Sequence, residues 1–295
     1  MLLLTLVYTE YGALPFVRDV FYGLAPVVVG IFIVAVVRLG RTAVGDSQQA
    51  WLAVGAAVLA AFSPFGIVGT LLLAGCLGVT IYHRRRAGMA AAVVLLASYA
   101  AVRLSGGVIE PAALVLDQSG AVGIGDITLF FFGVGAFSFG GGLSMLAFMQ
   151  EQVVNHLHWL TAREFLDGLA LGQLTPGPIL MVAAFVGYKL AGIAGALAAA
   201  AAIFLPSFLL MLALLPWFAR IKQWLWMRAA LKGVVPAVIG VLVVALGGML
   251  PAAATDVFTA LIVVATVIAL LVWRLGPLPP MFAGAAAGFI ARLVR

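Results

Sequence analysis

Residues 23–35 read GLAPVVVGIFIVA, and residues 233–245 read GVVPAVIGVLVVA. At a constant offset of 210 the two stretches share six identical residues, and their other seven positions are apolar in both. The identical pairs are Gly23/Gly233, Pro26/Pro236, Val28/Val238, Gly30/Gly240, Val34/Val244 and Ala35/Ala245. Ala74-Gly75 and Ala283-Gly284 match at nearly the same offset. A Gly-Pro-Gly spacing repeated inside apolar sequence predicts two copies of one helical unit.

The composition around this repeat places the chain in a membrane. Of the 295 residues, 65% are hydrophobic and 9% are charged, too few to cover a water-soluble fold. The same apolar content excludes a disordered chain. Apolar runs of 17 residues or more recur without alternation, which excludes a transmembrane β-barrel. We therefore expect an all-α, polytopic helical membrane protein.

The charges predict how the two copies are oriented. The net charge of +6 does not indicate nucleic acid binding, because the basic residues cluster at the ends of apolar runs. Arg38 and Arg41 follow the first copy, whereas the second copy is preceded by Arg220, Lys222, Arg228 and Lys232. If basic loops face the cytoplasm, the copies insert in opposite senses, a common plan of secondary transporters. This orientation requires the apolar segment Phe165–Tyr188 to cross the membrane.

Two interruptions at membrane depth suggest a site for an anion. Residues 137–142 read FSFGGG and residues 175–178 read TPGP. Glycine triplets and prolines both break helices, and unwound backbone in a bilayer must be buried or line a cavity. A helix restarting after each break would point free N–H groups inward. We expect Pro176 at a first helical position with Thr175 as its cap. The alternative for each motif is a simple kink with close glycine packing.

Further polar residues carry less weight. Asp167 is either a proton-linked carboxylate in a cavity or an interfacial residue paired with Arg163. Tyr188 and Lys189 fit interfacial anchors. His156 and His158, two residues apart, do not form a metal site, and no catalytic set lies in the apolar segments. We therefore predict no enzyme, no metal and no cofactor.

The order and spacing of several motifs resemble the chromate transporter family over about residues 126–216. The motifs are Phe137–Gly142, Trp159 with Glu164–Asp167, Gln173–Pro178, Val186–Tyr188, Gly192–Ala196 and Leu205–Ser207. The resemblance implies a multi-pass protein of the cytoplasmic (inner) membrane that exports chromate, a tetrahedral dianion, by secondary active transport.

The family's FGGG and PGP motifs carry over onto this chain, and with neighbouring polar residues they give a predicted substrate site. Its members are Phe139, Gly140, Gly141, Gly142, Ser144, Gln173, Thr175, Pro176, Gly177 and Pro178, with Asp167 as a possible coupling residue. The partners implied are chromate or a sulfate-like oxyanion and the lipid bilayer.

The domain organisation follows from the same resemblance. Residues 1–86 resemble the later part of a first transporter repeat, 87–125 a connector with one short apolar segment, and 126–295 a complete second repeat. The first unit lacks its own FGGG-like and PGP-like motifs, so the chain is expected to be truncated or to work with a second copy or a partner half-transporter. The alternatives to export are import of sulfate or another oxyanion, and a truncated membrane subunit that transports nothing.

Overall fold

A computed structural model describes residues 1–12, 14–63, 66–104, 122–136, 142–215 and 224–293. These residues form helices and contain no strand, which confirms the all-α prediction. The α-helices are α1 (Leu2–Tyr11), α2 (Pro15–Ala43), α3 (Ser47–Phe62), α4 (Gly66–Tyr82), α5 (Arg85–Leu104), α6 (Ile124–Ala136), α7 (Gly142–Gln150), α8 (Ala162–Leu174), α9 (Val182–Leu214), α11 (Leu225–Ala253), α12 (Val257–Leu271) and α13 (Leu278–Leu293). A π-helix, η1 (Glu151–His156), and a 3₁₀ turn, η2 (Ile179–Met181), join them. Three helical stretches, Pro15–Ala43, Ile179–Leu214 and Leu225–Ala253, are long and apolar enough to cross a bilayer.

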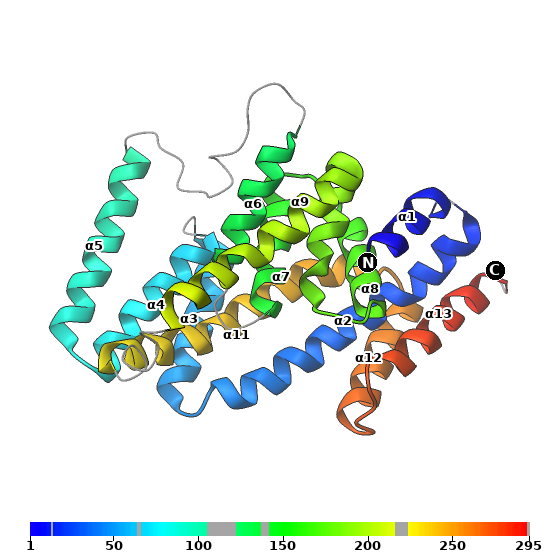
Figure 1. Cartoon of the computed structure of the whole chain (residues 1–295). Helices are drawn as coiled ribbons and strands as arrows, with labels where there is room; N and C mark the ends of the chain where they lie inside the picture. The colour runs from blue at the N-terminus through cyan, green and yellow to red at the C-terminus, as the bar shows by residue number, and fades with distance from the viewer. Residues whose placement is uncertain (13, 64–65, 105–121, 137–141, 216–223, 294–295) are drawn as a thin grey trace.

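The two sequence repeats appear as two interlocked units. Each unit is a long helix, α2 or α11, followed by a hairpin, α3–α4 or α12–α13. The hairpins are exchanged, because α2 packs mainly on α12 and α13 whereas α11 packs on α3 and α4. Figure 1 shows α2 and α11 crossing the molecule in opposite directions. This arrangement confirms the inverted repeat.

The repeated glycines make this exchange possible. A Cβ on Gly23 would overlap the carbonyl oxygen of Gly284 in α13, and one on Gly233 would overlap that of Ala74 in α4. Adding 210 converts the second contact into the first, since Gly23 corresponds to Gly233 and Ala74 to Gly284. The hairpins are therefore related by an offset of 210, and the sequence match of Ala74-Gly75 with Ala283-Gly284 is one residue out of register. Helices approach this closely only where both present small residues.

Matched caps fix the start of each hairpin. The side chain of Asp46 accepts a hydrogen bond from the Gln49 amide (2.7 Å) at the start of α3, and that of Asp256 accepts one from the Thr259 amide (2.8 Å) at the start of α12. The two aspartates are also 210 residues apart. Each satisfies a free N–H group of its helix.

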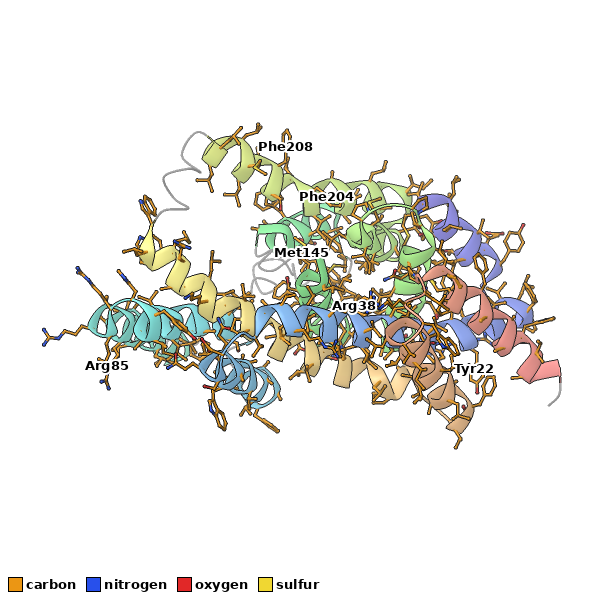
Figure 2. All side chains as sticks on the ribbon, turned by 90° about the horizontal axis from the view of Figure 1, so that it is seen from below. Tyr22, Arg38, Arg85, Met145, Phe204 and Phe208 are labelled. Atoms are coloured by element: carbon orange, nitrogen blue, oxygen red, sulfur yellow. The ribbon has the colours of Figure 1, made fainter. Side chains whose placement is uncertain are left out.

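The two ends of α2 meet different surroundings. Near its C-terminal end, Arg38 donates a hydrogen bond to the carbonyl oxygen of Leu270 (2.7 Å), and near its N-terminal end the Tyr22 hydroxyl bonds Asp256. Figure 2 shows these two side chains well apart along α2, with Arg85 projecting from the start of α5. The charged cavity described below lies at the Tyr22 end.

Candidate functional site: two broken helices and a charged cavity

The α8–α9 segment is a hairpin that returns to its starting side. At its ends, Lys189 Nζ lies 2.9 Å from Glu164 Oε1. Further in, Gly168 faces the Phe185 ring, and a Cβ on Gly172 would lie 2.8 Å from Val182 Cγ2. These three contacts share one antiparallel register, whose turn falls at Gly177.

The prediction that Phe165–Tyr188 crosses the membrane is therefore wrong. The segment is re-entrant, because Pro176, Gly177 and Pro178 reverse the chain. Gly177 has φ +152°, a value that residues with a side chain rarely adopt. Hydropathy measures only length and polarity, so it cannot separate a hairpin of two half-helices from one crossing helix.

A second reversal follows inside α9. Ala191 (φ −142°) and Gly192 (φ +61°) depart from helical geometry, so α9 consists of two helices joined at a sharp bend. Across this bend Gly187 packs against the backbone of Gly195. The long part of α9 after Gly192 then packs along α6.

The two predicted breaks meet in the structure. A Cβ on Gly142, at the start of α7, would lie 3.4 Å from Ile179 Cγ2 and 3.6 Å from Leu180 Cγ, just after the Pro-Gly-Pro turn. Ser144 is buried on α7. Phe139, Gly140 and Gly141 lie outside the described residues. The end of the glycine motif and the restart after the proline motif are thus neighbours.

The predicted helix start at Pro176 is wrong. Thr175 ends α8 instead of capping a new helix, and its hydroxyl donates to the Leu171 carbonyl oxygen (2.8 Å). Helical structure resumes at Ile179. A residue before proline avoids the α region, so Pro176 and Pro178 keep both Thr175 and Gly177 out of it. Pro176, Gly177 and Pro178 are exposed, and Gln173 is half-buried.

A cavity of about 1000 Å³ lies at the other end of α8. Its lining comes from α1, α2, α8, α9 and α13 and carries six charged groups: Arg18, Asp19, Arg163, Glu164, Asp167 and Lys189. Thr9, Tyr8 and Tyr22 add hydroxyls. The sequence analysis singled out only Asp167 here as functional and took Lys189 for an interfacial anchor.

Asp167 is the most buried carboxylate of the cavity, with 6% of its surface exposed. The Tyr8 hydroxyl donates to Oδ2 (2.7 Å), and Arg163 Nε lies 3.5 Å from Oδ1. The Tyr8 ring packs edge-on against Phe21 (5.0 Å) and near Phe185 (5.6 Å), which fixes its hydroxyl. Both readings of Asp167 therefore hold, since it pairs with Arg163 and lines a cavity. Tyr8 could not be assigned from sequence, because it lies 159 residues away.

Glu164 fixes the mouth of the hairpin. It forms a capping box with Thr161 and also pairs with Lys189. Burial opposes its charged form, but the hydrogen bonds from Lys189 and Thr161 outweigh burial and hold the pKa of Glu164 below its usual value. Glu164 is therefore charged at neutral pH and ties α8 to α9.

A polytopic helical fold with an inverted repeat, re-entrant broken helices and a charged internal cavity defines a membrane transporter. A family model described as chromate transporter matches residues 1–79 and 125–289, so the chain belongs to the chromate transporter family.

Named relatives agree with this assignment. The chain is 32% identical to a chromate transport protein of Cupriavidus metallidurans over 280 residues, which is 95% of this chain and 68% of that protein. It is 32% identical to a probable chromate transport protein of Synechococcus elongatus (72% of this chain, 53% of that protein). It is 28% identical to an uncharacterized transporter of Methanocaldococcus jannaschii (82% and 61%). The chain thus spans between about half and two thirds of these relatives, and no solved structure matches it.

Proposed function

We propose that this protein exports chromate, or a related tetrahedral oxyanion, across the cytoplasmic membrane by secondary active transport. The observation that carries the proposal is the meeting of the two breaks, with Gly142 against Ile179. Main-chain N–H groups at Phe139–Gly142 and Thr175–Pro178, assisted by Ser144 and Gln173, would hold the dianion there. Such donors suit an anion because helix starts carry unsatisfied N–H groups and a positive dipole end.

The outward direction is supported by charge and by the membrane potential. Arg38 and Arg41 lie at one end of α2 and the charged cavity at the other. The positive-inside rule then opens the cavity to the outside. A potential that is negative inside drives a dianion outward with roughly 4.6 kcal/mol per 100 mV, because each charge contributes about 2.3 kcal/mol. We propose Asp167 as the residue through which proton movement is coupled to transport.

The interlocked repeats supply a frame for alternating access. We propose that residues 1–86 are the later part of a first repeat and 126–295 a complete second one, joined by 87–125. Rocking of two inverted units about the crossing of α2 and α11 would expose the breaks to each side in turn. A second copy of the chain, or a partner half-transporter, would complete the first unit.

The test is chromate accumulation in cells that express the protein. Cells with the wild-type chain should accumulate less chromate than cells with an empty vector. Gly141→Leu, which fills the proposed backbone site, should abolish the difference. Gly133→Ala is the matched control, because a Cβ at Gly133 meets nothing within 4 Å. Equal accumulation with and without the wild-type protein would refute export.

Uptake in inside-out and right-side-out vesicles separates the alternatives. Import would appear as sulfate uptake driven in the opposite direction, and a non-transporting subunit would move neither ion. Normal transport by Gly141→Leu would remove the backbone site while leaving the direction established.

A further inference from the structure

The ion pairs in the charged cavity are incomplete. Asp167 Oδ1 is buried and accepts no hydrogen bond, although Arg163 Nε lies 3.5 Å away. An arginine carries five N–H donors, and a fork of two of them binds oxyanions well. Arg163 keeps about a third of its side chain exposed toward the cavity. It is therefore held near Asp167 without being fully used by it.

A second cation in the cavity shares this property. Lys189 uses one contact to Glu164, at 2.9 Å, with 27% of its side chain exposed. Arg18 lines the same cavity and has no ion-pair partner among the described residues. The cavity therefore presents three cations around a space of about 1000 Å³, ample for a tetrahedral dianion.

We propose that this cavity is a second binding site for the transported dianion, at which Arg163 releases Asp167 and binds the solute together with Lys189. The inference rests on the proposed function and deepens it, because it adds a side-chain site to the backbone site. Asp167 acts here as an internal anion that occupies Arg163 when no solute is present.

The exchange couples the solute to a proton. Once Arg163 turns to the dianion, the buried Asp167 carboxylate keeps only the Tyr8 hydroxyl as a partner, and an unpaired buried charge is costly. Asp167 then takes up a proton from water in the cavity. The charged or titratable groups that face it are Tyr8 from α1, Arg18, Asp19 and Tyr22 from α2, Arg163 and Glu164 from α8, and Lys189 from α9. By linkage, the dianion and the proton strengthen each other's binding by the same factor.

The position of α1 connects the two sites. Tyr8 contacts Asp167, whereas Met1 Sδ lies 3.4 Å from Thr175 Oγ1 beside the Pro-Gly-Pro turn. The eight residues from Asp167 to Thr175 span about 12 Å of α8 at 1.5 Å per residue. A solute leaving the backbone site thus meets the cavity about two helical turns nearer the outer surface.

The test is calorimetric titration of the purified protein in nanodiscs with sulfate and with chromate, at several pH values and in two buffers of different ionisation enthalpy. The wild type should bind either dianion more tightly at low pH and take up a proton on binding. Arg163→Gln should weaken binding about tenfold or more, since it removes charged hydrogen bonds to the solute. Asp167→Asn should bind without proton uptake and with an affinity that no longer depends on pH.

Arg228→Gln is the matched control, because Arg228 is the repeat equivalent of Arg18 but lies away from the cavity; it should bind as the wild type does. Arg163→Lys, which keeps the charge and loses the fork, should fall between wild type and Arg163→Gln. Wild-type affinity in Arg163→Gln, or unchanged proton uptake in Asp167→Asn, would overturn this inference and leave the proposed function standing. Failure of the wild type to bind any oxyanion would instead count against the proposed function.

Discussion

The neighbourhoods of Gly23 and Gly233 are equivalent in the frame and opposite in chemistry. Both glycines pack on the second helix of an exchanged hairpin, and each follows an arginine by five residues, Arg18 or Arg228. Beside the start of α2 lies the charged cavity. Beside the start of α11 lies an apolar pocket of about 440 Å³, lined by Cys76, Trp226 and Val234 among others.

The difference shows where the polar chemistry originates. The frame helices contribute only Arg18, Asp19 and Tyr22 to the cavity, and the tight ion pairs come from α8 and α9. No equivalent of α8 packs at the apolar pocket, where Ala91 of α5 contributes to the lining instead. The repeated units therefore provide a scaffold, and the re-entrant hairpin converts one of its two equivalent places into a site.

The largest effect should come from breaking the equivalence of the frame contacts. In Gly23→Ala the new methyl group would overlap the Gly284 carbonyl oxygen, and in Gly233→Ala that of Ala74. Backbone cannot rotate away, so each variant should lose about 3 kcal/mol, the upper end for overpacking. Thermal unfolding in detergent should show a similar drop for both. Gly247→Ala, with nothing within 4 Å of its Cβ, should melt as the wild type does; a stable Gly23→Ala protein would contradict the exchanged packing.

The next effect tests the hairpin that distinguishes the two places. Gly177→Ala forces a side chain onto φ +152° at the turn, at a cost of about 2 kcal/mol. Because a Cβ there meets no atom within 4 Å, the loss should come from the backbone alone. Chromate export should fall much more than in Gly133→Ala, a glycine in helical conformation. Unchanged export would show that the reversed turn is not needed for transport.

A smaller effect separates the ion pair of the charged cavity from the frame. Glu164→Gln removes the pairing with Lys189 and weakens the capping box, and it should lower stability by about 1 kcal/mol at pH 7. Because folding lowers the pKa of Glu164, its contribution is complete above its usual pKa of 4.5 and disappears as the pH falls through the folded value. The melting temperatures of the variant and the wild type should therefore converge at low pH. A gap that stays constant down to pH 3 would exclude this role.

The sequence predicts the frame better than the site. The Gly-Pro-Gly spacing and the charge asymmetry identify an inverted repeat, because close helix contacts demand small residues at fixed positions. The breaks at Gly142 and at Pro176–Pro178 are also readable, since glycine and proline act locally. The exchange of hairpins and the contact of Tyr8 with Asp167 are not readable, because they join residues far apart in the chain. The re-entrant course of Phe165–Tyr188 is hidden for another reason, as its two arms are as apolar as one crossing helix.

The smallest effect should appear on the apolar side of the comparison. Lys232, the repeat equivalent of Tyr22, places Nζ 5.0 Å from the centre of the Tyr82 ring. Lys232→Met keeps the length of the side chain and removes a cation–π contact, so stability should fall by about 0.5 kcal/mol, as at other exposed sites. This change should not vary between pH 4 and 7, in contrast to Glu164→Gln, because lysine stays charged there. A loss as large and as pH-dependent as that of Glu164→Gln would mean that charge matters equally on both sides, and the re-entrant hairpin would then not be the source of the difference.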